Sequence, residues 1–305
     1  METPNSMPER HIVSISQLPD ATKREMDFLE SSFFQNPNHR LPTPAQVKAL
    51  STDISTTPKP EPIIFENPNI FVKFGLYVTI AEAQCLWMIR QVFRGKIPVP
   101  ELFGWRIDDE GHVFIYMELI QGKRLADRWD GLDSVDKGVL RDQLCDIVGC
   151  LRQLEQDPSD KFIGSINRQP PLDYVFELQP GGRPFLSVKD FNDWFASLVQ
   201  QRLLPSLKCK DPYRHILPDD GAIKFTHADL HRANIMVSSD SPIRILGIVD
   251  WEQSGWYPDF WEYCKAHYTC WCEDEWRVDF FDKFLLPRMD EFLVFSEYTM
   301  SIGAV

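Results

Sequence analysis

The sequence predicts an α+β fold, with strands in its first half and mainly helices in its second half. Residues 61–74 have the pattern of two short strands, and Asn67-Pro68-Asn69 marks the turn. An apolar strand is expected at 113–119. Apolar residues spaced at i, i+4, i+7, i+8 and i+11 over 140–151 predict one helical face, and 185–204 is a second amphipathic helical region.

Length and composition indicate an ordinary globular protein. A chain of 305 residues can form one large domain or two lobes with a substantial core. Hydrophobic residues make up 43% and charged residues 25%. No apolar run approaches the roughly 18 residues of a membrane span, and no signal peptide is visible at the start. We therefore expect a cytoplasmic protein, in which the seven cysteines are reduced thiols.

Net charge restricts the class of partner. The chain carries a formal charge of −13. Nucleic acids and anionic membranes both require a basic surface, so neither is expected to bind. A nucleotide triphosphate would need a local positive patch and a divalent cation.

One stretch, residues 222–252, contains a dense set of polar residues between apolar strands. The first apolar run leads into Asp229 and Asn234, and a second run from Ile243 to Val249 ends on Asp250. A turn at Ser238 to Pro242 separates them. We expect a hairpin that brings the three polar side chains to one end of a strand pair. An ordinary hairpin in which Asp229 caps a helix is the other interpretation.

The order of these residues resembles a known family. The stretch His-Ala-Asp-Leu-His-Arg-Ala-Asn, from His227 to Asn234, followed by Ile-Val-Asp-Trp-Glu, resembles the aminoglycoside phosphotransferase family. That family is a small-molecule branch of the protein-kinase-like fold, related to choline and fructosamine kinases. The segment Ser254 to Tyr263 is similar to fungal members. The resemblance extends over most of the chain.

The resemblance implies a bilobal protein-kinase-like fold. A small N-terminal lobe with an antiparallel sheet (61–119) would bind nucleotide, and a larger, mainly helical lobe (120–305) would carry the catalytic loop and the acceptor-binding helices. Residues 1–60 would form a leader with short helices. Asp20 to Phe34 is expected to be one helix, and Thr43-Pro44 is expected to open another that ends at Leu50.

A lysine and a glutamate stand where the family binds phosphate. Lys73 lies between Val72 and Phe74 in a strand, so its side chain points away from theirs. Glu82 lies in the first turn of the helix expected at 79–92. The resemblance implies that this pair holds the α- and β-phosphates. Solvated surface charges are the alternative for each residue alone.

Two features bear on nucleotide binding. The expected hairpin at 61–74 lacks the glycine-rich loop of protein kinases, so its sequence does not favour a close approach of backbone N–H groups to phosphate. The expected strand at 113–119 stops at Gly122, which is typical of a hinge. The resemblance implies that main-chain groups of Glu118 to Ile120 bind adenine; a simple connecting loop is the alternative.

The resemblance also implies roles in the catalytic loop. Asp229 would orient the acceptor hydroxyl and accept its proton, while Asn234 and Asp250 would bind Mg²⁺. His227 would support the loop.

The region after Asp250 combines aromatic and acidic residues. In relatives it lines the acceptor site, and this composition suits a cationic acceptor through charge pairing and cation–π contact. The alternative is that the aromatic rings pack in the core while the carboxylates face water. Cys270 and Cys272 do not have the spacing of a zinc site.

These observations predict a kinase that transfers the γ-phosphate of ATP or GTP, with Mg²⁺, to a hydroxyl of a small molecule. One alternative is a catalytically weak or inactive nucleotide-binding scaffold. A protein kinase is disfavoured, because Asp250-Trp251-Glu252 replaces Asp-Phe-Gly, and His231 stands where those enzymes have lysine. The acceptor and the oligomeric state are left open.

Overall fold

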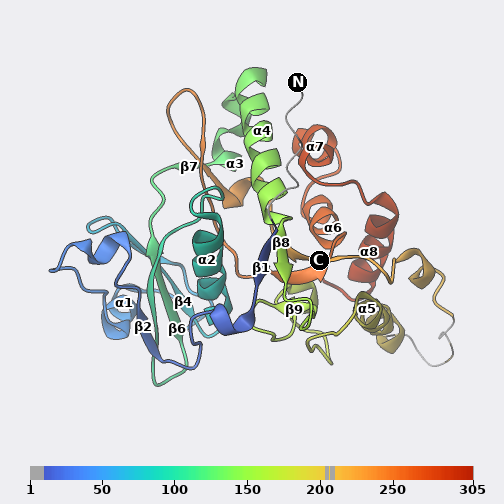
Figure 1. Cartoon of the computed structure of the whole chain (residues 1–305), viewed down its shortest axis with the longest axis horizontal. Coiled ribbons are helices and arrows are strands. Elements are labelled where there is room, and N and C mark those ends of the chain that lie inside the picture. The colour runs from blue at the N-terminus through green and yellow to red at the C-terminus, as the bar shows by residue number, and fades with distance from the viewer. Residues whose placement is uncertain (1–9, 203–205, 207–209, 305) are drawn as a thin grey trace. The chain divides into compact units, whose positions relative to one another are not determined.

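The computed structural model describes residues 10–202, 206 and 210–304, which form two compact units (Figure 1). The sheet unit comprises Leu18–Leu140 and Arg232–Glu252. The helical unit comprises the described residues of Met1–Gln17, Arg141–His231 and Gln253–Val305. The three-part division expected at residues 60 and 119 stays a prediction.

The sheet unit is built on a five-stranded antiparallel sheet of order β2-β5-β6-β4-β3. Helix α2 packs against its strands β5 and β6 (Figure 1). The elements of this layer are β2 (Glu25–Asp27), β3 (Ile63–Phe65), β4 (Ile70–Gly75), α2 (Ile80–Phe93), β5 (Leu102–Ile107) and β6 (Val113–Glu118).

The side chains of strand β4 alternate between the two faces of this sheet. Val72 and Phe74 are fully buried on one face, in a core that includes Val47 of helix α1 (Pro44–Leu50). Phe74 stacks on Phe114 with ring centroids 5.4 Å apart. Lys73 points the other way, as the alternation of a strand requires.

The leader differs in part from expectation. Helix α1 begins as predicted: Thr43 and Gln46 form a capping box, and the helix ends at Leu50. The helix expected over Asp20 to Phe34 is wrong, since that stretch contains strand β2 and the 3₁₀ helix η2 (Ser32–Gln35). Pairing with β5 overrides the local apolar pattern. Gly104 permits this pairing, because a Cβ there would lie 2.4 Å from the Met26 carbonyl oxygen.

A second, three-stranded sheet of order β12-β11-β7 completes the sheet unit. The expected hairpin is present: β11 (Ile235–Val237) pairs antiparallel with β12 (Ile245–Ile248). The remaining elements are β7 (Lys123–Arg124), α3 (Leu125–Arg128), the 3₁₀ helices η3 (Trp129–Gly131) and η7 (Arg232–Asn234), and the first residues of α4 (Ser134–Leu151).

The helical unit combines two small sheets with packed helices. Strands β10, β13 and β9 form one sheet, and β1 pairs with β8. Helix α8 packs against α5 and α6 (Figure 1). The elements are β1 (His11–Val13), η1 (Ile15–Gln17), β8 (Leu154–Gln156), β9 (Gly164–Ser165), η4 (Tyr174–Phe176), α5 (Val188–Arg202), η6 (Arg214–Ile216), β10 (Ile223–Thr226), β13 (Gly255–Pro258), α6 (Trp261–Tyr268), the π-helix η8 (Trp276–Phe280), α7 (Phe281–Phe284) and α8 (Met289–Ser301).

Helix α4 is present where the apolar spacing predicted a helix. Asp133 caps the first turn of this helix. Asp133 accepts the N–H groups of Val135 and Asp136 through its carboxylate, at 2.9 Å each. Within the described residues, no helix combines the length and apolar character of a membrane span.

The core of the helical unit is aromatic and centres on Trp261. Its ring lies 4.9 Å from Phe295, 5.2 Å from Phe191 and 5.3 Å from Phe176, centroid to centroid. Its Nε1 donates a hydrogen bond of 2.8 Å to Asp173. Trp261 therefore joins α5, α6 and α8 around one side chain.

Substituting Trp261→Ala should lower the free energy of unfolding by about 3–5 kcal/mol, because the ring is fully buried and leaves a cavity. Trp271→Ala is the matched control, since Trp271 is 86% exposed and should change stability by less than about 0.5 kcal/mol. Chemical denaturation measures both. Equal losses in the two variants would contradict the packing described for Trp261.

Candidate functional site

Three carboxylates of the sheet unit gather around the ammonium group of Lys73. Its Nζ lies 2.9 and 3.0 Å from the two carboxylate oxygens of Glu82, 2.5 Å from Asp250 and 2.8 Å from Glu252. Strand β4, helix α2 and the segment after β12 supply these residues. The lysine and glutamate singled out in the sequence are therefore in direct contact.

Burial governs the protonation of this cluster. Burial lowers the pKa of Lys73, but the carboxylates of Glu82, Asp250 and Glu252 outweigh it, and the pKa is raised. Lys73 is therefore charged at neutral pH. Burial raises the pKa of Glu82 against the opposing effect of Lys73, and the carboxylates of Asp250 and Glu252 raise it further. Another cation near Asp250 and Glu252 would offset the repulsion among these carboxylates.

The hairpin holds Asn234 and Asp250 at the same end. The backbone carbonyl of Asn234 accepts a hydrogen bond of 2.9 Å from Val249, next to Asp250. Asp250 has φ of 63°, in the left-handed region that a non-glycine residue seldom adopts. Such a conformation persists where surrounding contacts enforce it.

The residues of this cluster fit a magnesium ion. Glu82, Asp250 and Glu252 each offer a carboxylate oxygen, and these oxygens lie within 4.8 Å of one another. Lys59 also pairs with Glu252, so two ammonium groups lie among the three carboxylates. Carboxylate oxygens are the hard ligands that Mg²⁺ prefers.

Glu252 and Lys59 were not singled out as site residues in the sequence. Glu252 lies only two residues after Asp250, so its closeness in sequence is the signal that could have indicated it. Lys59 is far away in sequence, and no local pattern marks it.

The expected hinge retains a free donor at Ile120. The N–H of Glu118 donates to the Glu101 carbonyl at 2.8 Å, and the N–H of Leu119 donates to that of Asn69 at 3.3 Å. The Ile120 carbonyl accepts from Gly122 at 3.0 Å. Among the described residues the N–H of Ile120 has no partner, so it can donate to a bound molecule.

In the helical unit, the loop that carries Asp229 is held by a buried carboxylate. Glu262 of α6 accepts the N–H groups of His227 and Ala228 at 2.7 and 3.1 Å. Ala228 has φ of 65°. The N–H of Asp229 donates to Nδ1 of His227 at 3.2 Å. These contacts fix the backbone that leads into Asp229.

The electrostatic surroundings keep Asp229 ionised. Burial raises its pKa, but the hydrogen bond from His231 and the charges of His231, His227 and Lys265 outweigh this effect. The net pKa is lowered. Nε2 of His231 lies 3.5 Å from the Asp229 carboxylate. At neutral pH Asp229 is therefore a carboxylate able to accept a proton.

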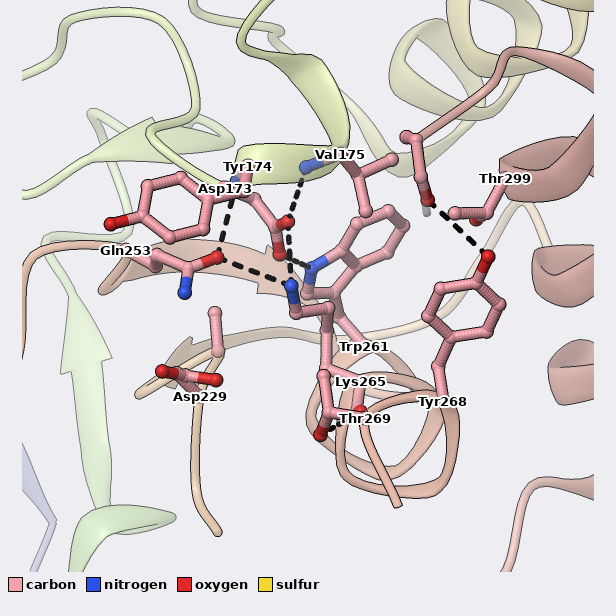
Figure 2. A network of polar contacts seen from close by, with 12 residues as sticks. Asp173, Tyr174, Val175, Asp229, Gln253, Trp261, Lys265, Tyr268, Thr269 and Thr299 are labelled. Atoms are coloured by element: carbon pink, nitrogen blue, oxygen red, sulfur yellow. Dashed lines mark hydrogen bonds and ion pairs between the residues drawn. The ribbon is translucent and has the colours of Figure 1, made fainter. Parts of the chain in front are cut away.

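Asp229 opens into a cavity of about 450 Å³ within the helical unit. Figure 2 shows its wall, where Lys265 and Gln253 lie beside the network around Asp173. Its lining includes Tyr174, Arg202, Tyr268 and Thr269. The volume lies in the range of small-molecule binding sites.

Most of the aromatic residues after Asp250 are part of the core. Their rings are largely buried, at Trp251, Trp256, Tyr257, Phe260, Trp261, Tyr263 and Trp276. Glu262 is also buried, bound to backbone N–H groups, whereas the alternative interpretation expected it to face water. Tyr268 is the residue of this run whose ring lines the Asp229 cavity.

Together, a strand lysine bound to a helix glutamate and a His-x-Asp loop in a mainly helical unit define a protein-kinase-like phosphotransferase. The model of the phosphotransferase enzyme family (APH) matches residues 86–292, which is more than half of the chain. The chain belongs to this family.

The chain is similar to solved structures of aminoglycoside phosphotransferases. An aminoglycoside 2'-phosphotransferase-IIIa point mutant in complex with GDP is similar with a TM-score of 0.50 and 16% identity. The similarity covers 89% of this chain and 85% of that one. A thermostable mutant of aminoglycoside phosphotransferase APH(4)-Ia with AMP-PNP and hygromycin B gives 0.48 at 16% identity, over 77% of each chain. No curated protein matches the chain significantly. The predicted α+β, protein-kinase-like fold is confirmed.

Substituting Glu262→Gln should destabilise the Asp229 loop, because an amide oxygen cannot replace both carboxylate oxygens as acceptors of two N–H groups. We expect a loss of about 1–3 kcal/mol in the free energy of unfolding. Glu273→Gln, at an exposed position, is the matched control. If denaturation curves of the two variants coincide, Glu262 does not hold the loop.

Substituting His231→Ala should raise the pKa of Asp229, because the hydrogen bond and charge that lower it are removed while burial remains. A carboxylate that must be ionised loses activity as pH falls through its pKa. The acidic limb of the kcat/KM profile for nucleotide turnover should therefore move to higher pH. His215→Ala, an exposed histidine, serves as control. An unmoved limb would show that His231 does not set this pKa.

Proposed function

We propose that this protein is a small-molecule kinase that transfers the γ-phosphate of ATP or GTP to an alcohol hydroxyl. The observation that carries the proposal is the Lys73 cluster, in which a buried ammonium is held by Glu82 beside the carboxylates of Asp250 and Glu252. Membership of a phosphotransferase family supports it. Its cytoplasmic location stays a prediction.

The proposed reaction is a simple displacement. The acceptor hydroxyl oxygen forms a bond to the γ-phosphorus, the bond from that phosphorus to the β,γ-bridging oxygen breaks, and the nucleoside diphosphate leaves. Asp229 orients the hydroxyl and takes its proton. A bound Mg²⁺ would neutralise charge on the phosphates.

The remaining residues bind and position. Lys73, fixed by Glu82, binds the α- and β-phosphates. Asn234, Asp250 and Glu252 hold the cation. Main-chain groups of Glu118 to Ile120 bind the base, with the N–H of Ile120 as the donor. Such positioning and charge neutralisation account for most of the rate in phosphoryl transfer.

The acceptor belongs in the cavity next to Asp229. A screen for MgATP and MgGTP consumption across aminoglycosides, choline-like amines, sugars and amino alcohols would identify it. A nucleotide that binds the folded protein raises its melting temperature. Binding without consumption of nucleotide with any acceptor would favour the alternative of a nucleotide-binding scaffold.

Substituting Asp229→Asn should reduce turnover about 10²–10⁴-fold, because the amide cannot accept the proton. The rise in melting temperature with millimolar MgATP should persist, since Asp229 is not assigned to nucleotide binding. Asp240→Asn, on the exposed turn after β11, is the matched control and should keep its activity. Wild-type turnover in the Asp229 variant would refute the assigned role.

A further inference from the structure

Gln253 is a buried glutamine on the wall of the Asp229 cavity. Its residue is 2% exposed. Its side-chain oxygen accepts two hydrogen bonds, from the N–H of Tyr174 and from Nζ of Lys265, each 3.1 Å long. Neither of these groups can accept a hydrogen bond, so the amide oxygen must face them.

The amide nitrogen of Gln253 is therefore on the opposite side. It carries two N–H donors, and among the described residues it has no hydrogen-bond partner. Figure 2 shows this nitrogen turned toward the carboxylate of Asp229, while the oxygen faces Lys265. Gln253 and Asp229 both line the cavity. This nitrogen opens into the cavity, where it can donate to a bound molecule.

A rigid network holds Gln253 in this orientation. Lys265, 4% exposed, donates to Asp173 at 2.9 Å. Asp173 also accepts the N–H of Val175 at 2.9 Å and Nε1 of Trp261 at 2.8 Å. The amide is thus anchored through Lys265 to the aromatic core, as expected for a preorganised binding group.

The charges of the network indicate the chemistry of the bound atom. The ammonium of Lys265 is balanced by the carboxylate of Asp173, so the wall carries no net charge at this point. The groups that Gln253 itself offers to the cavity are N–H donors. An ammonium group of an amine acceptor has no lone pair to accept from them, whereas a hydroxyl or ether oxygen has.

We propose that Gln253 determines acceptor specificity: its amide nitrogen donates a hydrogen bond to a second, uncharged oxygen of the acceptor, next to the hydroxyl presented to Asp229. The acceptor is accordingly a polyol of sugar type, with oxygen and not an amine at that position. Lys265 and Asp173 are positioning residues that act through Gln253. This inference rests on the proposed function, and a binding measurement without nucleotide tests it separately.

The test follows the side-chain amide resonance of Gln253 by ¹H–¹⁵N NMR, assigned from its loss in Gln253→Leu. The full chain is titrated with D-glucose, myo-inositol and glycerol, and in parallel with ethanolamine and choline. At least one polyol should shift this resonance in a saturable way, and neither amine should. The proposal fails if no polyol shifts it, or if an amine does so equally.

Variants locate the effect. Gln253→Leu should weaken binding of the polyol about tenfold, the equivalent of one hydrogen bond. Gln253→Glu keeps an oxygen for Tyr174 and Lys265, so it keeps the fold, and it should weaken binding at least as much because the donors are lost. Lys265→Met should also weaken binding. If the Gln253 resonance is unchanged in that variant, Lys265 does not position Gln253.

Gln156→Leu controls for stability. Gln156 is another buried glutamine of the helical unit, and both ends of its amide are bonded to Phe162. This variant should lose stability but bind the polyol as the wild type does. Unchanged polyol binding in Gln253→Leu overturns the inference. Absence of nucleotide consumption with every acceptor overturns the proposed function instead, whatever the binding data show.

Discussion

Each unit of this protein depends on buried charges that must be balanced. In the sheet unit the ammonium of Lys73 lies among three carboxylates. In the helical unit Lys265 is paired with Asp173, and Glu262 is bound by two backbone N–H groups. A buried charge without its partner costs several kcal/mol, so these contacts fix the elements that carry them.

These balanced charges hold the backbone that positions Asp229 and Asp250. The left-handed backbone at Ala228 and Asp250 would relax if the surrounding contacts did not enforce it. Glu262 holds the first of these, beside Asp229. The second places the Asp250 carboxylate against Lys73. Strain and charge are thus concentrated where phosphoryl transfer is proposed, and the packed aromatic rings around Trp261 stabilise the helical unit.

Local patterns in the sequence predicted much of this arrangement. The alternation around Lys73, the first-turn position of Glu82 and the turn between the strands before Asp250 each follow from spacing within a few residues. The helix expected over Asp20 to Phe34 failed, because pairing with β5 outweighed a weak local preference.

Contacts between distant segments could not be predicted in this way. Asp173 binds Lys265 across 92 positions, and Lys59 reaches Glu252 across 193. Nothing near Gln253 in the sequence marks it as anchored, because its partners come from Tyr174 and Lys265. The composition after Asp250 suggested a cationic acceptor, but burial of most of these rings, and of Glu262, leaves few of them to contact one.

The central claim is that this protein transfers the γ-phosphate of a nucleotide to a hydroxyl. The most direct measurement is ³¹P NMR of the wild-type protein with MgATP and a mixture of polyols. The account predicts a new phosphomonoester resonance that grows in step with ADP and is absent without the polyols. The account is contradicted if no nucleotide is consumed with the polyols or with amines, whether MgATP or MgGTP is supplied.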